Sequence, residues 1–138
     1  MKDQLKALKI IHLALCASVI SAYIFMTNLE SIKTIFNVSI DSTEDYIFIL
    51  LPIAAFIIGN FIFKFMLKSV DKKTSEASVF NNFQTASIVR WAVLEGTAFI
   101  VLFMKPEFII SGIVIIIYLF LLMPTEEKFK KEINALQL

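Results

Sequence analysis

Arg90 and Glu95 are oppositely charged residues inside one apolar segment that runs from about Thr85 to Met104. A charged side chain costs roughly 3 kcal/mol at the centre of a bilayer on insertion scales, so intramembrane charges usually mark a functional or structural contact. A carboxyl group there can exchange a proton, bind a cation or accept a hydrogen bond from another helix. An arginine can pair with polar groups or extend toward lipid phosphate. Five residues on a helix give about 140° of rotation, so we expect Arg90 and Glu95 to have different partners.

Polar residues on the other apolar segments reach comparable depths and are the candidate partners. Asn60 and Tyr118 match the depth of Arg90, Ser18 and Ser21 approach that of Glu95, and His12 lies nearer the surface. We therefore predict an intramembrane polar cluster: Arg90, Glu95, Asn60, Tyr118, Ser18, Ser21 and His12. For Glu95 two interpretations stay open, a protonated side chain that hydrogen-bonds structurally and a proton or ligand site.

Several other kinds of chemistry lack a signature in this sequence. There is no glycine-rich phosphate loop, nucleophile elbow or H-E-x-x-H motif. His12 is the only histidine and Cys16 the only cysteine, which argues against a metal site, a disulfide or a thiol redox pair. A net charge of +1 gives no reason to expect nucleic acid as a partner. We therefore predict no cofactor, no metal and no enzymatic activity.

The elements that position these residues are four apolar segments of nearly membrane-spanning length. The chain is 58% hydrophobic, well above the roughly 45–50% of soluble domains. A helix needs about 17–25 residues to cross the hydrocarbon, and the segments lie at about 10–27, 46–67, 85–104 and 108–123. We predict an all-α integral membrane protein with a single domain over residues 1–138, a four-helix bundle built from two antiparallel transmembrane hairpins.

The boundaries of these segments carry recognisable helix signals. Pro106 can occupy the first turn of the fourth helix, and Pro124 marks its end. Asp41 with Glu44 resembles a capping box that opens the second span. Two further segments are expected to be amphipathic. Part of the first connection has Leu29, Ile32 and Phe36 on one face and can lie along the membrane surface. A cytoplasmic tail over 125–138 is capped by Thr125 and has three apolar residues on one side: Phe129, Ile133 and Leu136.

The basic residues that flank the spans are distributed unequally. Two of them, Lys33 and Lys105, lie on one side of the predicted membrane. Ten lie on the other side: Lys2, Lys6, Lys9, Lys64, Lys68, Lys72, Lys73, Lys128, Lys130 and Lys131. Because cytoplasmic loops carry the excess of positive charge, we expect both termini in the cytoplasm and the protein in the cytoplasmic (inner) membrane.

Small residues recur four positions apart on three of the spans. These series are Ala14, Ser18 and Ala22; Ala17 and Ser21; Ala55 and Gly59; and Ala92 and Gly96. Small residues at this spacing let helix backbones approach closely in lipid. We expect them mainly to pack helices within one chain, with contacts between copies of the chain as the alternative.

The run Gln84-Thr85-Ala86-Ser87-Ile88-Val89-Arg90-Trp91-Ala92-Val93-Leu94-Glu95-Gly96 resembles a signature of short bacterial four-span membrane proteins of unassigned function. Pro124-Thr125-Glu126 is similar to the ending after their last span, and the resemblance implies no activity. A more distant similarity is to rotary ATPase proteolipid subunits, where Glu95 would take the role of the membrane carboxylate. This chain lacks their glycine-rich first helix. Small multidrug transporters also have four spans and one membrane Glu, but theirs lies in the first span.

These observations predict a non-enzymatic multi-pass membrane protein that acts as a homo-oligomer or as a subunit of a larger membrane assembly. Its partners would be the lipid bilayer and other membrane protein subunits. The alternative is a proton- or cation-coupled transporter or channel subunit in which Glu95 titrates. An intramembrane enzyme ranks third because the polar residues include no convincing nucleophile.

Overall fold

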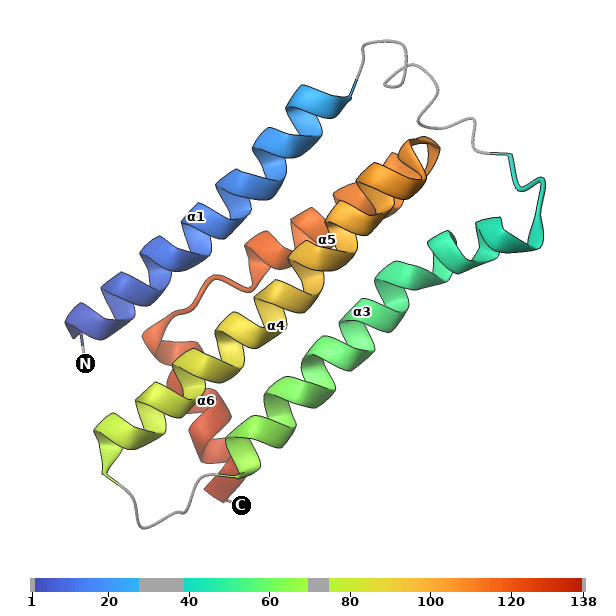
Figure 1. The fold of residues 1–138 in the computed structure, drawn as a ribbon. Helices are drawn as coiled ribbons and strands as arrows, with labels where there is room; N and C mark the ends of the chain where they lie inside the picture. The colour runs from blue at the N-terminus through green and yellow to red at the C-terminus, as the bar shows by residue number, and fades with distance from the viewer. Residues whose placement is uncertain (1, 28–38, 70–74, 138) are drawn as a thin grey trace.

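The computed structural model of the protein describes residues 2–27, 39–69 and 75–137, and this part of the chain is helical without strands. The elements are α1 (Lys2–Met26), α3 (Thr43–Lys68), α4 (Glu76–Met104), the short 3-10 helix η1 (Pro106–Phe108), α5 (Ile109–Leu121) and α6 (Glu126–Gln137) (Figure 1). The predicted all-α class is therefore confirmed. The proposed surface helix containing Leu29, Ile32 and Phe36 lies outside the described residues.

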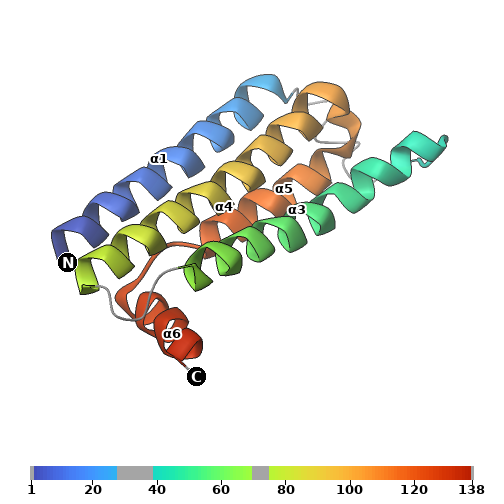
Figure 2. The same ribbon diagram turned by 60° about the horizontal axis from the view of Figure 1, so that its bottom comes forward.

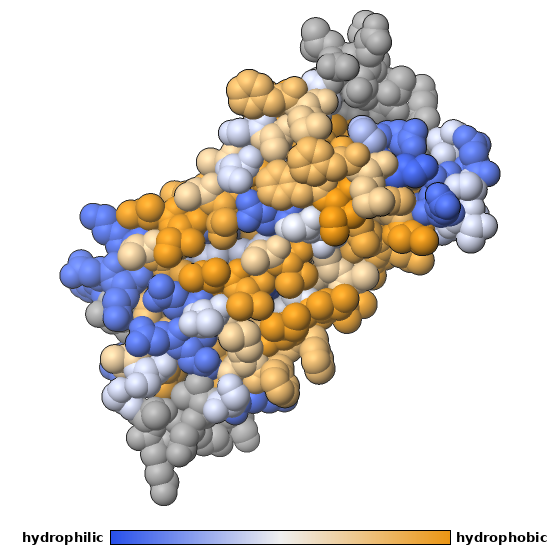
Figure 3. Space-filling model, in the orientation of Figure 1, coloured by the Kyte–Doolittle hydropathy of each residue, from blue (hydrophilic) through white to orange (hydrophobic). Residues whose placement is uncertain are grey.

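Three of the helices, α1, α3 and α4, are each long and apolar enough to cross a membrane. Helix α5 has only 13 residues and reaches that length only together with α6, from which it is bent by 89°. The chain thus has three candidate spans, or four if the bent pair counts as one. The face of the molecule shown in Figure 3 agrees with a membrane protein, because apolar residues cover much of its middle and hydrophilic residues gather toward its ends.

Helix α4 lies between the other long helices and packs against α1, α3 and α5 (Figures 1 and 2). Its buried side chains recur every three or four residues, which places them along one broad face of the helix. Trp91 and Leu94 on this face are almost fully buried and join the main hydrophobic core together with Phe63 of α3 and Leu119 of α5. This central position explains why residues on different sides of α4 have different neighbours.

The start of α3 corrects one detail of the sequence analysis. The capping residue is Ser42 and its partner is Asp45, one position later than the predicted pair Asp41 and Glu44. The Asp45 carboxylate accepts hydrogen bonds from the backbone N–H groups of Asp41 and Ser42, at 2.9 and 3.0 Å. Both pairs have the same three-residue spacing, so the sequence alone did not separate them.

Lys105, in the turn between α4 and η1, forms an ion pair with the beginning of α3. Its ammonium group lies 3.4 Å from carboxylate oxygens of both Asp45 and Glu107. These hydrogen-bonded carboxylates raise the pKa of Lys105. Pro106 then opens η1, which leads directly into α5, in agreement with its predicted place in the first turn of the fourth helix.

Helix α6 is the predicted amphipathic tail and lies near the end of the molecule where α3 ends (Figure 2). The Thr125 hydroxyl accepts a hydrogen bond from the backbone N–H of Lys128 at 3.2 Å, as expected for a cap. Phe129 is buried, with its ring centroid 5.2 and 5.1 Å from those of Phe80 and Phe83. The tail is therefore docked on the body of the protein through α4. The side chain of Leu136 is not among those described.

The small-residue series fall into two groups with different surroundings. Ala55 and Gly59 are buried in α3, and Gly59 faces the side chain of Arg90. By contrast, Ala14 and Ser18 of α1 and the pair Ala92 and Gly96 of α4 are exposed, and Ala22 is half-buried. The expectation of packing within one chain thus fits α3 but not the exposed pairs. On α1 the larger residues take the inward positions: Leu5, Leu8, His12, Cys16, Val19 and Tyr23.

Candidate functional site

Arg90 is held by neutral groups of α3. Its Nη1 donates a hydrogen bond to Asn60 Oδ1 at 3.3 Å, and its guanidinium carbon lies 3.8 Å from the centroid of the Phe63 ring. Asn60 Nδ2 in turn donates to the hydroxyl of Tyr118 on α5 at 2.9 Å and to the backbone carbonyl of Phe56. A chain of polar contacts from Arg90 through Asn60 to Tyr118 therefore joins α4, α3 and α5.

The positive charge of Arg90 has no carboxylate within salt-bridge distance among the described residues. Its buried Nε has no hydrogen-bond partner there, and Glu132 of α6 acts on it only through longer-range electrostatics. A cation over an aromatic face gains about 0.5–2 kcal/mol, more where water is excluded. The Phe63 ring therefore supplies part of the stabilisation that a carboxylate would otherwise give.

A second cation lies near this group. Lys128 Nζ donates to the backbone carbonyls of Leu121 and Met123 at 2.7 and 2.9 Å, and so satisfies carbonyl groups at the end of α5. Burial lowers the pKa of Lys128, and the positive charge of Arg90 lowers it further. Lys128 is thus a second positive charge near Arg90.

Glu95 faces the opposite side of α4, toward α1. The Ser18 hydroxyl donates a hydrogen bond to Glu95 Oε1 at 3.0 Å. Glu95 is half-buried, and around this pair lie the exposed small residues Ala14, Ala92 and Gly96. We call Ala14, Ser18, Ala92, Glu95 and Gly96 the Glu95 patch. It combines a carboxyl group with exposed small residues on two membrane-length helices.

His12 forms a third and separate group. It is fully buried, and its Nε2 donates a hydrogen bond to the backbone carbonyl of Leu119 at 2.8 Å. Its ring meets Trp91 edge to face, with centroids 4.6 Å apart, and Cys16 Sγ lies 3.8 Å from Nε2. These contacts link α1 with α4 and α5 and give His12 the role of a satisfied core residue.

The structure thus divides the predicted single cluster into three groups. Arg90, Asn60 and Tyr118 lie together, Glu95 pairs with Ser18, and His12 packs beside Trp91, while Ser21 is exposed. The cause is helix geometry, since the roughly 140° between positions 90 and 95 turns Arg90 toward α3 and Glu95 toward α1. Within the described ranges, no group of three or more His, Cys, Asp or Glu side chains gathers to hold a metal ion.

One polar contact has no counterpart in the sequence analysis. The Tyr23 hydroxyl donates to the backbone carbonyl of Ala98 at 2.6 Å, and Tyr23 is buried beside Gly112 of α5. A tyrosine near the end of one span and a glycine in another were visible in the sequence, but their pairing depends on the relative heights of α1, α4 and α5.

Comparison with known proteins adds no assignment to this geometry. No protein family, curated protein or solved structure matches this chain. The resemblance of the third span to short bacterial four-span proteins therefore stays a prediction. What the chain does has to be argued from its own polar groups.

Proposed function

We propose that this chain is a non-enzymatic multi-pass protein of the cytoplasmic (inner) membrane that works as a homo-oligomer or as a subunit of a larger membrane assembly. The Glu95 patch supports this proposal more than any other feature. The carboxyl group of Glu95 is half-buried with one described hydrogen-bond donor, Ser18, although both lie on membrane-length helices. In lipid, leaving such a group without further partners is unfavourable, and a neighbouring helix can provide them.

The neighbours of Glu95 suit a helix contact. A Cβ built on Gly96 would have no atom within 4 Å, and Ala14 and Ala92 are also exposed. Small residues let a second helix approach closely, and a polar hydrogen bond between helices in a membrane contributes about 1–2 kcal/mol in model peptides. The Glu95 patch can therefore contribute both close packing and a hydrogen bond to an assembly.

A second candidate function is proton- or cation-coupled transport, which is favoured because Glu95 has no salt-bridge partner among the described residues. Among the described residues no cation forms a salt bridge with Glu95, and Arg90 is engaged on the other side of α4. A membrane carboxyl group without a fixed counter-ion is free to exchange a proton or a cation. This candidate uses the same residue and so can be tested with the same variants.

Glu95→Leu is expected to weaken association between copies roughly tenfold, because it removes a hydrogen bond of about 1–2 kcal/mol from the proposed contact. Glu95→Gln keeps most hydrogen bonds and should associate nearly as the wild type does. Energy transfer between labelled copies in liposomes measures association. Gly96→Leu should also weaken it by adding bulk, whereas Val114→Leu, at an exposed position of α5, is the matched control.

Ion flux in the same liposomes separates the two candidates. A coupled transporter should move protons or cations down an imposed gradient, and Glu95→Gln should abolish this flux while association stays intact. Unchanged association in both Glu95→Leu and Gly96→Leu would refute the proposed contact. Wild-type liposomes without flux would refute the transporter.

The orientation is tested separately by thiol labelling in a Cys16→Ser background. The proposal that both termini are cytoplasmic predicts that Ile40→Cys reacts with a membrane-impermeant reagent added outside intact cells, while Lys72→Cys does not. The described parts of the chain support this side assignment, because α1 begins and α3 ends at the same end of the molecule (Figure 1). Labelling with the opposite sidedness would overturn the orientation.

A further inference from the structure

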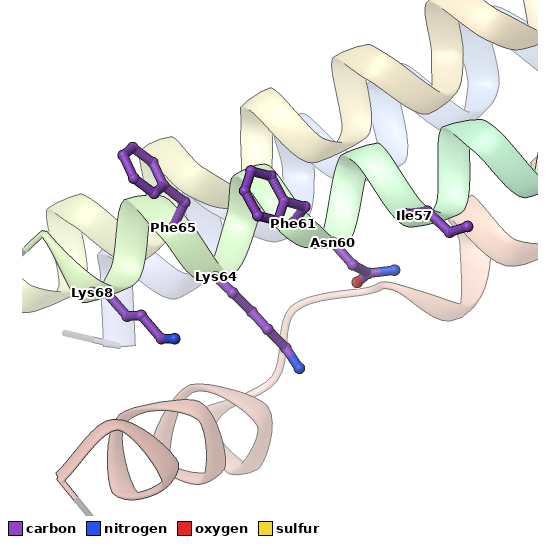
Figure 4. A pocket seen from close by; sticks show the side chains of 6 residues that line it. All are labelled: Ile57, Asn60, Phe61, Lys64, Phe65 and Lys68. Carbon is purple, nitrogen blue, oxygen red and sulfur yellow. The ribbon is translucent and has the colours of Figure 1, made fainter.

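A hollow on the outer side of α3 combines an apolar lining with two lysines. Its volume is about 400 Å³, and it is lined by Ile57, Asn60, Phe61, Lys64, Phe65 and Lys68. Figure 4 shows that the side chains of Asn60, Lys64 and Lys68 extend on the side of α3 that faces α6 and the segment before it. The hollow therefore runs from an apolar stretch of a membrane-length helix toward its basic end.

The two lysines that line this hollow carry positive charges without a salt-bridge partner among the described residues. Lys64 and Lys68 are exposed, and no salt bridge within the described part of the chain involves either of them. Asn60, which lines the hollow, accepts its hydrogen bond from Arg90, so a third positive charge lies directly behind the lining. An anion placed beside the two lysines would thus meet two positive charges, and Arg90 lies further along the lining, behind Asn60.

The apolar part of the lining restricts what that anion can be. Ile57, Phe61 and Phe65 are between 59% and 70% exposed, and they occupy successive turns of α3 before and between the lysines. A small inorganic anion would leave these side chains uncovered. A molecule with an acidic head and a hydrocarbon chain matches both parts of the hollow at once.

We propose that this hollow binds an anionic phospholipid, with its phosphate at Lys64 and Lys68 and an acyl chain along Ile57, Phe61 and Phe65. Basic pockets at the ends of membrane helices are favourable sites for acidic headgroups, because lysine attracts phosphate where the hydrocarbon ends. Asn60 lies in the apolar stretch of the hollow, where its hydrogen bond with Arg90 joins the lining to α4. The site would be occupied from the leaflet that faces the basic end of α3.

The test uses the full chain in a zwitterionic detergent and native mass spectrometry to count bound lipids. Phosphatidylglycerol and phosphatidylcholine with identical acyl chains are titrated in parallel, together with inorganic phosphate. We expect one phosphatidylglycerol to bind preferentially. The double substitution Lys64→Gln and Lys68→Gln should weaken its binding by about 30-fold, since each lysine near an acidic headgroup contributes about 1 kcal/mol.

The matched control is Lys2→Gln with Lys6→Gln, another exposed pair four residues apart on a helix, at the same end of the molecule. It should leave the affinity within about twofold of wild type. Phe61→Ala removes an exposed ring from the lining and should weaken binding of both lipids without disturbing the core.

Three results would overturn the proposal. Equal losses in the two lysine pairs would mean that only the overall charge attracts the lipid. Equal binding of phosphatidylcholine and phosphatidylglycerol would mean that the lysines do not recognise the headgroup. Inorganic phosphate displacing the lipid at similar concentrations would show a simple anion site in place of a lipid site.

Discussion

Gly112→Ala is expected to destabilise the folded protein by about 3 kcal/mol, at the upper end of the usual cost of overpacking. A Cβ built at this position would overlap the hydroxyl oxygen and the ring of Tyr23. The Tyr23 side chain cannot simply rotate away, because it is buried and its hydroxyl donates to Ala98 O at 2.6 Å. Unfolding in mixed micelles with increasing SDS, followed by Trp91 fluorescence, measures the free energy.

Gly96→Ala is the matched control, since a Cβ there would have no atom within 4 Å and alanine favours the helix more than glycine. It should be neutral or stabilising by up to about 1 kcal/mol in the same assay. Adding Gly112→Ala to a Tyr23→Ala background should cost much less than in the wild type. An equal cost in both backgrounds would show that the contact between Tyr23 and Gly112 is not the cause.

Arg90→Leu should lower the free energy of unfolding by about 2–5 kcal/mol, even though leucine makes the third span easier to insert by about 3 kcal/mol. The loss combines a hydrogen bond from a charged group, about 1.5–3 kcal/mol, with the cation–π contact, about 0.5–2 kcal/mol. The partners that lose these contacts are Asn60 and Phe63. The SDS titration measures the change, and a glycosylation-based insertion assay measures insertion separately.

The pairing of Arg90 with Asn60 can be isolated by a double-mutant cycle. Asn60→Leu should also destabilise, and the double variant should lose less than the two single losses together, with a coupling of about 0.5–3 kcal/mol. If Arg90→Leu were neutral or stabilising, the contacts of Arg90 with α3 would contribute nothing to the free energy of unfolding. Extension of the arginine side chain toward lipid phosphate would then explain how its charge is accommodated.

The helical segments were largely predictable because the hydropathy of this chain changes sharply at its polar turns. The apolar segments near 46–67 and 85–104 fall within α3 and α4, the segment near 10–27 ends one residue beyond α1, and Thr125 caps α6 as expected. Hydropathy does not report how far a helix continues beyond the apolar segment, so α4 begins nine residues earlier, at Glu76. It also did not reveal that α5 is only 13 residues long before the chain bends.

The contacts of the polar side chains were harder to predict, because the depth of a residue along its helix does not determine the direction in which its side chain points. Equal depth suggested Asn60 and Tyr118 for Arg90, and both Ser18 and Ser21 for Glu95. In the structure Arg90 contacts Asn60, which contacts Tyr118, while Glu95 contacts Ser18 and Ser21 is exposed. The partner of His12 is a backbone carbonyl, which every residue carries, so nothing in the sequence distinguishes Leu119. The inward face of α1 was also missed, because its small residues suggested a packing seam where larger residues pack instead.

The hydrogen bonds between α1 and the other helices can form only late in synthesis. Its hydrogen bonds to other helices reach Glu95, Ala98 and Leu119, the last of them 107 positions further along the chain. During synthesis α1 leaves the ribosome before any of these residues exist, so His12 and Ser18 first enter the bilayer without the partners that they have in the finished protein. The hydrogen bonds of α1 to α4 and α5 can therefore form only after these later helices have been made.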